Sequence, residues 1–393
     1  MSRTESYTYD EQSRLKTAGY GDGQTQGYGF DAMGNRTAKT DNVTGSESYA
    51  FDDANRIATR QVGSSAVQSY TSDANGNTLT DASHTNKWDS QNRLVSSLSN
   101  GKTSDFRYGA DGLRRKYTVT PTGQNTPTSI THYGYDGTNV VREWEENIAG
   151  VLYASATYLL GPSGPMYKRP ANAADVRWYV YDGLGSVVGE VDVTGNLIAE
   201  KKHDVFGLRR GTVGTEKSRH GFVGSLGHYS DDETGLVYMR ARYYDPAIGR
   251  FVSEDSKAHG VNWFVYCTND PVNSVDLSGN SAITLLVVVF LTFIAFTLGI
   301  IGSNVHLPAQ TQCKLREMGL FLASVDFAIM AVELSALALI AGPVGILAIV
   351  AIGIAASLCV LSFVLAWDEH NAADQGAPRV FSDDKPGLPN ANE

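Results

Sequence analysis

The stretch YGFDAMGNRTAKT (residues 28–40) has the composition of a β-hairpin, and similar stretches recur before and after it. Each copy places a tyrosine or phenylalanine within three residues before an aspartate. The aspartates Asp10, Asp31, Asp52 and Asp73 follow one another at intervals of 21 residues. Self-similarity at a fixed period of this size identifies a repeat architecture.

The residue types around each aspartate explain why the repeat should fold as a hairpin. Asp and Asn bond to the backbone of tight turns, and Gly adopts the positive φ angles that such turns require. One hairpin cannot bury its aromatic face alone, but stacked hairpins can. The theme continues at Asp89, Asp111, Asp136 and Asp182, so we expect residues 1 to about 230 to form a long antiparallel sheet that curls as it grows.

Two later stretches carry a more specific signal. GFVGSLGHYSDDETGLVYMRARYYDPAIGRFVSEDS (residues 221–256) contains the motifs ETGL, Y-x-R-A-R-Y-Y-D-P and G-R-F, and residues 262–280 read NWFVYCTNDPVNSVDLSGN. With these motifs the chain resembles the Rhs/YD-repeat family and its Rhs-associated core domain. The resemblance implies a β-cocoon wound from hairpins, a core that plugs it and a variable C-terminal payload. The repeats are too few to close a whole cocoon, so we expect part of one.

In the toxin branch of this family, the resemblance implies an aspartyl autoprotease that cuts after the core and frees the payload. The implied residues are Arg242, Asp255 and Asp276, and the cut falls near Asn280–Ser281. Two carboxylates held close together cannot both ionise easily, so one can act as an acid while the other activates water. A neighbouring guanidinium can orient the pair.

The expected cleavage sequence departs from the family pattern D-P-x-G-L, because Leu277 replaces the proline and Asn280 replaces the final leucine. Asp255 also lacks the proline that usually follows it. Self-cleavage therefore either survives with an altered cleavage sequence or is lost. Apart from this reaction on itself, we do not expect the chain to be an enzyme.

Other polar residues give no comparable signal. We expect His203 and Asp204 to lie in another turn, and His220, His228 and His259 are scattered without the spacing of metal ligands. Three widely spaced cysteines form neither a disulfide framework nor a zinc motif. We predict no metal and no cofactor.

Beyond residue 280 the composition changes abruptly. Residues 282–302 and 343–367 are uncharged apolar runs long enough to span a bilayer as helices, and residues 318–342 contain only Asp326 and Glu333 as charged residues within a third run. Seven residues apart, these two acids share one helix face. They either form a polar stripe that lines a cation path, or belong to an amphipathic segment at the membrane interface or against protein.

The sequence thus predicts a mainly β protein followed by an α-helical transmembrane module. Its expected segments are a repeat sheet (1–220), a core domain (221–280), a hydrophobic helical module (281–367) and a disordered polar tail (368–393). The net charge of −10 argues against nucleic acid as a partner. The N-terminus has no apolar stretch typical of a signal peptide.

Three functions fit these features. In the first, the chain is the C-terminal part of an Rhs-type secreted effector with a pore-forming or depolarising module. Its partners are then a lipid bilayer, an immunity protein and a secretion apparatus, and it is membrane-associated after delivery by a secretion system. In the second, it is a membrane-anchored YD-repeat adhesion protein. In the third, it is a displaced and non-functional Rhs tip. Three apolar segments exceed what an anchor needs, which favours the effector.

Overall fold

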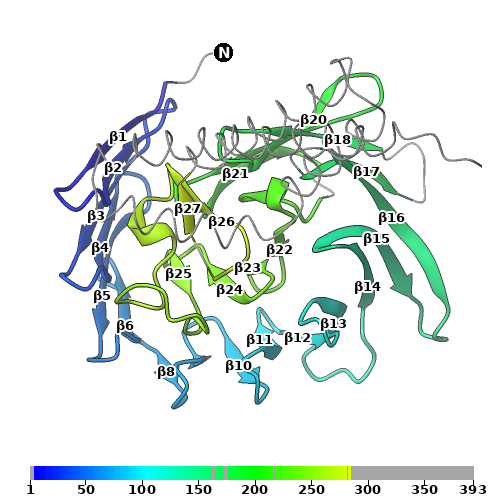
Figure 1. The fold of residues 1–393 in the computed structure, drawn as a ribbon, viewed down its shortest axis with the longest axis horizontal. Helices are drawn as coiled ribbons and strands as arrows, with labels where there is room; N and C mark the ends of the chain where they lie inside the picture. Colours follow the sequence, from blue (N-terminus) through cyan, green and yellow to red (C-terminus); the bar gives the residue numbers. More distant parts are fainter. Residues whose placement is uncertain (1–3, 162–163, 171–175, 216–217, 281, 285–393) are drawn as a thin grey trace, which may run out of the picture. The chain divides into compact units, whose positions relative to one another are not determined.

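The computed structural model describes residues 4–161, 164–170, 176–215, 218–280 and 282–284. Most of these residues form antiparallel strands, as the repeat predicts (Figure 1). Strands β1–β21 form two curved sheets, which together we call the wall. Residues 221–280 form the core segment, with its own small strands.

The first sheet of the wall has seven strands, each paired with its neighbour in sequence. They are β1 (Ser6–Tyr9), β2 (Leu15–Gly19), β3 (Thr25–Phe30), β4 (Arg36–Asp41), β5 (Gly45–Phe51), β6 (Ile57–Val62) and β7 (Gln68–Ser69).

The second sheet has fourteen strands, again in sequence order. They are β8 (Thr71–Ser72), β9 (Thr78–Thr80), β10 (Thr85–Trp88), β11 (Leu94–Ser99), β12 (Lys102–Tyr108), β13 (Arg114–Pro121), β14 (Ser129–Asp136), β15 (Asn139–Glu146), β16 (Leu152–Gly161), β17 (Gly164–Pro170), β18 (Arg177–Tyr181), β19 (Val187–Val191), β20 (Leu197–His203) and β21 (Arg209–Gly214).

The aspartate turns have one recurring geometry, which the first repeat shows well. The backbone N–H of Asp10 donates to the carbonyl of Arg14 (2.9 Å), and the Asp10 carboxylate accepts the backbone N–H groups of Gln12 (3.0 Å) and Arg14 (2.9 Å). Ser13 adopts a φ of 61°, the left-handed region that Gly or Asn occupies in most other copies. The same carboxylate bonds recur at Asp52, Asp73, Asp89, Asp182, Asp192 and Asp204.

Two of the predicted turn aspartates use a different turn. Near Asp111, the turn that Asp10 begins in the first repeat begins instead at Gly109, two residues before the aspartate. There the Gly109 N–H donates to the Leu113 carbonyl (2.9 Å). Asp136 ends β14 and faces Asn139 across a two-residue turn. Both still lie at hairpin ends, so the predicted placement is confirmed.

The core segment lies inside the curve of the wall (Figure 1). Its elements are the 3₁₀ turn η2 (Gly224–Leu226), the sheet β22 (Tyr229–Asp231), β23 (Leu236–Met239), β24 (Arg242–Asp245) and β25 (Arg250–Phe251), the turn η3 (Cys267–Asn269) and strand β26 (Ser274–Asp276). Strand β26 pairs with β27 (Ala282–Thr284), which lies beyond the segment. Backbone hydrogen bonds join it to the wall, for example from Thr78 N–H to the Val252 carbonyl (2.9 Å).

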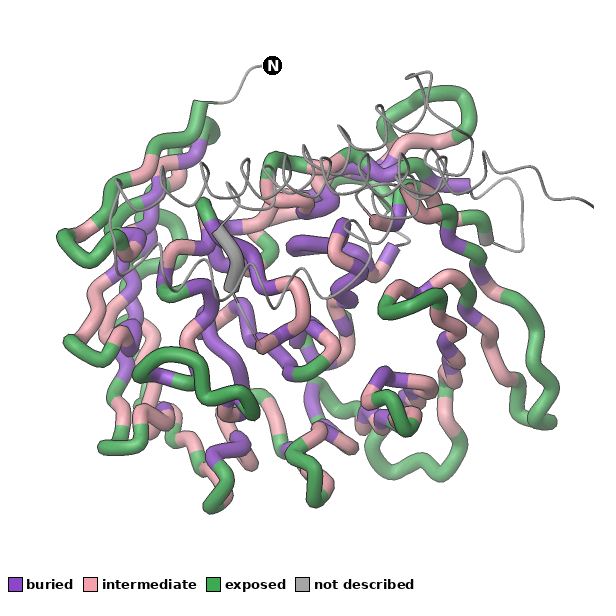
Figure 2. Tube along the Cα trace, in the orientation of Figure 1, coloured by how far each residue is buried: buried purple, intermediate pink, exposed green. Residues whose placement is uncertain are grey.

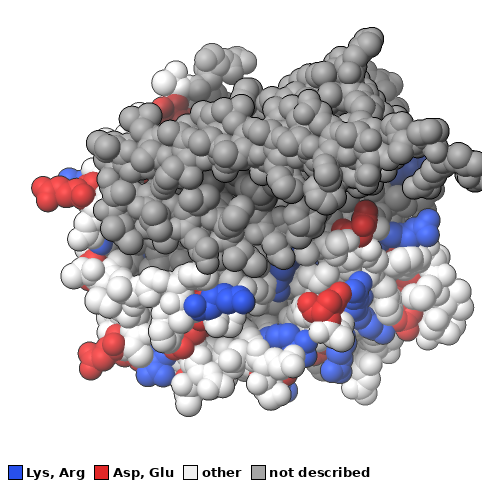
Figure 3. All heavy atoms as spheres, in the orientation of Figure 1, with Lys and Arg blue, Asp and Glu red and all other residues white. Residues whose placement is uncertain are grey.

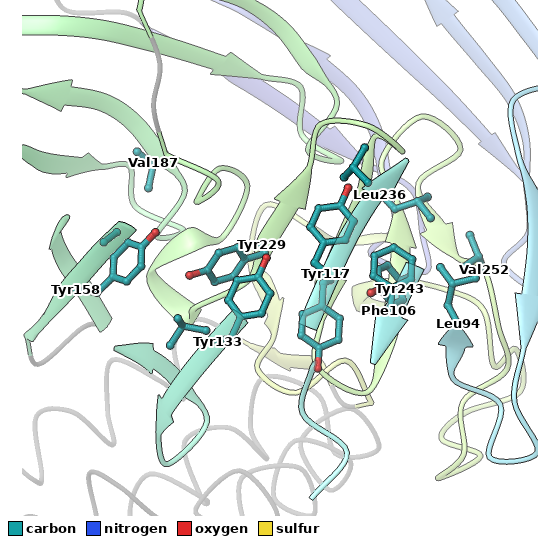
Figure 4. Close-up of a cluster of buried hydrophobic side chains, with 14 of the residues drawn as sticks. Leu94, Phe106, Tyr117, Tyr133, Tyr158, Val187, Tyr229, Leu236, Tyr243 and Val252 are labelled. Atoms are coloured by element: carbon teal, nitrogen blue, oxygen red, sulfur yellow. The ribbon is translucent and has the colours of Figure 1, made fainter. Parts of the chain in front are cut away.

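Aromatic residues from wall and core segment share one buried cluster (Figure 4). The Phe106 and Tyr243 ring centroids are 5.2 Å apart, and Tyr133 meets Tyr229 edge to face at 5.6 Å. Burying such a ring contributes about 1.5–3 kcal/mol, so this cluster is a principal reason that the repeats wrap around the core segment. Buried residues gather where the two face each other, and exposed ones at the outer turns (Figure 2).

The two ends of the wall meet through side chains. Arg210 of β21 pairs with Asp22 in the turn between β2 and β3 (Nη2–Oδ1 2.6 Å), and its guanidinium lies over the Tyr20 ring. Deeper in, Lys39 of β4 pairs with Asp204 (3.3 Å), and both side chains are buried. We call these contacts, Arg210 with Asp22 and Lys39 with Asp204, the seam. The seam joins the two ends of the wall, so the strands form a single closed ring, although the repeats are too few for a whole cocoon.

The predicted helical module differs from the structure at its first residues. Ala282–Thr284 is a strand that pairs with Ser274–Asp276, so a helix from residue 282 is wrong at these three positions. The rest of the predicted membrane module and the predicted disordered tail lie outside the described residues. Across the part of the chain that is described, we find no helix with the length and apolarity to cross a membrane.

Candidate functional site

The three residues of the expected autoprotease meet at one end of the core segment. Arg242 begins β24, and its Nη2 lies 3.6 Å from Oδ2 of Asp255 and 3.7 Å from Oδ2 of Asp276. All three side chains are at least 95% buried. The structure therefore brings together, in a water-poor place, two carboxylates that are 21 residues apart in sequence.

The loop after Asp276 folds back over the guanidinium. Asp276 Oδ1 accepts the backbone N–H groups of Ser278 (3.1 Å) and Gly279 (2.8 Å), while Arg242 Nε donates to the Gly279 carbonyl. These bonds hold residues 276–280 directly against the site, where the predicted cleavage sequence would have to lie.

Asp255 is fixed by the loop that follows β25. Its Oδ1 accepts the backbone N–H of Lys257 (2.7 Å), and its own N–H donates to the Trp263 carbonyl (3.1 Å). Arg242 Nη1 donates to the same carbonyl (2.8 Å). Arg242 thus has a polar partner for each of its three nitrogens.

Burial sets the electrostatics of the site. It lowers the pKa of Arg242, and the negative charges of Asp255 and Asp276 oppose that shift. The guanidinium also lies 3.6 Å from the centroid of the Phe251 ring. The nearby thiol of Cys267 has a pKa well above its usual value, because burial and then the charge of Asp276 disfavour a thiolate. Cys267 therefore does not have the properties of a nucleophile.

His259 is a member of the site that the sequence did not indicate. Its Nδ1 lies 3.1 Å from the carbonyl oxygen of Asn280 and 3.6 Å from Oδ2 of Asp255. The loop from Asp255 to His259 turns back on itself through a bond from Ala258 N–H to the Asp255 carbonyl (2.9 Å). Only the spacing of four residues from Asp255 hinted at this, and that spacing alone is common.

The two residues that depart from the family pattern, Leu277 and Asn280, lie in defined environments. Leu277, in place of the proline, packs against the buried cluster that contains Phe222 and Tyr266. Asn280, in place of the leucine, has a buried Oδ1 with no hydrogen-bond partner among the described residues. Ser281 lies outside the described residues, as do Asp326 and Glu333.

Among the weaker histidine candidates, His220 and His228 are buried and His203 is partly buried. Burial, followed by the charges of Arg209 and Lys201, lowers the pKa of His203 to about 4. His220 has a pKa of about 3, with burial again the largest cause, so both imidazoles are neutral near pH 7. Asp204 begins a turn, as predicted, whereas His203 is the last residue of strand β20, so the predicted turn is wrong for His203. Within the described ranges, no three His, Cys, Asp or Glu side chains gather as a metal site would require.

Acidic and basic side chains are interspersed over the described surface on the face in Figure 3.

The aspartate turns and Arg242 lie in a part of the chain that is similar to known proteins. The teneurin YD-shell family model matches residues 1–272.

Among curated relatives, the tRNA3(Ser)-specific nuclease WapA of Bacillus spizizenii is 28% identical over 210 residues, which is 51% of this chain and 9% of that protein. The toxin protein Tse5 of Pseudomonas aeruginosa is 42% identical over 55 residues, 14% of this chain and 4% of that protein. The chain therefore spans less than a tenth of either relative. The Photorhabdus luminescens Tc holotoxin pore aligns at 17% identity and a TM-score of 0.41, covering 71% of this chain and 18% of that one.

Proposed function

This chain belongs to the teneurin YD-shell family of Rhs/YD-repeat proteins, and we propose that it is the C-terminal part of an Rhs-type secreted effector. In this proposal the core segment cuts the bond between Asn280 and Ser281, and the released C-terminal module acts on a membrane. The observation that carries the proposal is the convergence of Asp255 and Asp276 on Arg242, beneath the loop that leads to that bond.

The proposed reaction is hydrolysis of one peptide bond. One carboxylate of the pair takes a proton from a water molecule, and the water oxygen adds to the carbonyl carbon of Asn280. The other carboxyl group supplies a proton to the carbonyl oxygen. The C–N bond then breaks, the Ser281 nitrogen takes up a proton, and one water is consumed. Arg242 orients both carboxylates and holds the Gly279 carbonyl.

The cleavage step can be tested on the purified chain. Incubation should release a fragment of 113 residues that begins at Ser281, identified by intact mass and N-terminal sequencing. Asp255→Asn and Asp276→Asn should each leave the full-length chain. Asp232→Asn is the matched control, because this core acid is 65% exposed and lies outside the site. Wild-type chain that stays intact after prolonged incubation would contradict the proposed self-cleavage.

Membrane action is proposed for the module from the composition of residues 281–393. They contain four basic and nine acidic residues, two histidines and three long apolar runs, which is too little polar surface for an enzyme site on a soluble scaffold. The printed names of the relatives include a tRNA nuclease and a toxin, and those names describe the relatives. The proposal for this chain is instead dissipation of ion gradients, with a lipid bilayer as partner.

The membrane step has its own experiment. Expression in bacteria, with the C-terminal module directed to the membrane, should collapse the membrane potential while nucleic acid and cell wall stay intact. Asp326→Asn with Glu333→Gln should reduce cation conductance in planar bilayers more than it reduces insertion, because the change keeps shape and removes charge. A module that inserts and conducts nothing would favour the membrane-anchored adhesion protein.

An effector of this kind implies two further partners. A secretion apparatus would deliver the chain, and an immunity protein would protect the producing cell. A small multi-spanning membrane protein encoded directly downstream, whose co-expression restores membrane potential, is the expected immunity partner. A neighbouring protein without that effect would count against it.

A further inference from the structure

Consecutive carbonyl groups at the end of the core segment are held by two different side chains. Arg242 Nε donates to the carbonyl of Gly279, and His259 Nδ1 lies 3.1 Å from the carbonyl oxygen of Asn280. The second carbonyl belongs to the peptide bond that the proposed reaction would cut. Sequence analysis assigned no role to His259, and the family motifs that identify the other site residues do not include it.

We propose that His259 is a catalytic residue of the self-cleavage reaction and donates a hydrogen bond from Nδ1 to the Asn280 carbonyl oxygen. This inference rests on the proposed function, since it assigns a role within that reaction. The bond orients the carbonyl before attack. When water adds to the carbonyl carbon, electron density moves onto this oxygen, and the same N–H then stabilises the developing negative charge.

The position of His259 relative to Asp255 supports this role. Its Nδ1 lies 3.6 Å from Asp255 Oδ2, beyond ordinary hydrogen-bond length, whereas the Asn280 oxygen is within it. The Asn280 carbonyl oxygen and the Asp255 carboxylate therefore both lie close to His259 Nδ1. A water molecule activated by that carboxylate would be close to the carbonyl that it must attack.

The backbone around Gly279 explains why the carbonyl reaches the imidazole. Gly279 adopts a φ of 82°, and the Asp276 carboxylate accepts two successive N–H groups of this turn. The turn directs the next peptide group away from the buried guanidinium and toward the half-exposed His259. The site thus binds residues 276–280 through charged and polar groups on both sides.

The experiment measures the rate at which the 113-residue fragment appears from full-length chain. His259→Ala should slow cleavage roughly 100-fold, the usual effect of removing one such donor. His259→Gln retains an N–H donor and should lose less. Added imidazole should partly restore His259→Ala and leave Asp276→Asn inactive. Val261→Ala, in the same loop with a side chain that is 75% exposed, is the control for general disturbance, and thermal unfolding confirms that each variant is folded.

The outcomes separate the two proposals. Wild-type cleavage together with an unchanged rate in His259→Ala overturns the role of His259 and leaves the aspartate mechanism standing. Absence of cleavage in the wild type overturns the proposed self-cleavage.

A second measurement tests His259 without any cleavage. The Asp276→Asn chain is labelled with ¹⁵N-histidine, and the His259 signal is assigned by its loss in His259→Gln. A proton on Nδ1 is expected, because only a protonated Nδ1 can donate to the Asn280 carbonyl. A neutral ring with its proton on Nε2 overturns the inference.

Discussion

Arg114 of the wall and Asp231 of the core segment form an ion pair in the interior of the protein. Their side chains are 1% and 0% exposed, and Arg114 Nη2 lies 3.0 Å from Asp231 Oδ1. The guanidinium also lies 4.6 Å from the Tyr238 ring centroid and 5.2 Å from that of Tyr117. This buried ion pair ties strand β13 to strand β22.

Arg114→Leu should destabilise the protein by about 3–5 kcal/mol, because it leaves the Asp231 carboxylate buried without its partner. Adding Asp231→Leu should recover part of the loss, since it removes the buried carboxylate. The recovery should stay partial, because Arg219, whose Nη1 lies 3.9 Å from Asp231 Oδ1, then loses that partner. Arg115→Leu is the control, as its pair with Asp111 is more than 40% exposed and should contribute less than 1 kcal/mol. Chemical denaturation measures all four free energies. Equal losses for Arg114→Leu and Arg115→Leu would contradict the prediction.

His84 should make the stability depend on pH in the alkaline range. Its Nδ1 contacts Asp81 (2.9 Å) and its Nε2 contacts the Thr234 carbonyl of the core segment (2.7 Å), so both nitrogens face acceptors. Burial alone would lower the pKa of His84, but the hydrogen bond and charge of Asp81 raise it to about 9. The stabilisation is then complete below about pH 6.5 and disappears as pH rises through 9.

The contribution of His84 amounts to at most about 3 kcal/mol from a shift of this size. Burial acts to raise the pKa of the Asp81 carboxyl, but the hydrogen bond and charge of His84 outweigh it, and the pKa is lowered. The stabilisation that Asp81 contributes is therefore lost only when the pH falls through this lowered pKa. The difference in unfolding temperature between wild type and His84→Gln, measured from pH 5 to 10, should be largest near pH 6 and shrink above pH 8. A difference that grows with pH would contradict the assignment.

Loss of Arg210 should open the seam of the wall locally. Arg210→Ala removes the pair with Asp22 and the bond from Nε to Gln24 (2.7 Å). Hydrogen exchange should quicken roughly tenfold in β2, β3 and β21 and remain unchanged in β12, on the far side of the ring. Lys202→Ala is the control, because its Nζ is 3.5 Å from the same Asp22 and more exposed. Uniformly faster exchange would indicate global destabilisation instead.

Gly279→Ala should abolish self-cleavage without unfolding the protein. A Cβ at Gly279 would overlap the Met239 carbonyl, which is backbone and cannot move aside cheaply. The loop over Arg242 would shift, and the Asn280 carbonyl with it. Gly235→Ala shares the left-handed φ, 72° against 82°, but its Cβ would meet nothing within 4 Å. Cleavage should therefore survive in Gly235→Ala, and equal loss in both variants would contradict this account.

The repeat units were predictable because their turn chemistry is local. Asp52 bonds to Ala54 and Arg56 within five residues, so sequence spacing alone specifies the geometry. The same turn at Asn147 and Asp192 was overlooked, since the first has Asn in place of the aspartate and the second has no Tyr or Phe in the three positions before it. The seam between Arg210 and Asp22 is not local, and no periodic pattern encodes a contact across 188 positions.

The candidate site was predictable only through a resemblance. Asp255 and Asp276 are unremarkable in composition, and the core motif singled them out. His259 was missed because its position depends on how two loops close around Arg242, which residue types do not reveal. The start of the predicted helical module was wrong because Ala282–Thr284, although apolar, pairs with Ser274–Asp276 as a strand.

The position of the site residues in the sequence also determines when the site can form during synthesis. Every strand of the wall pairs with its sequence neighbour, so hairpins can form as they leave the ribosome. Arg242, Asp255 and Asp276 are synthesised after the whole wall, so the proposed site can assemble only once the core segment has been made. Synthesis of residues 281–393 takes roughly 6 to 23 s at ordinary translation speed. The chain thus builds its wall first, and the proposed cleavage cannot begin before residues 276–280 have been added and have folded against Arg242.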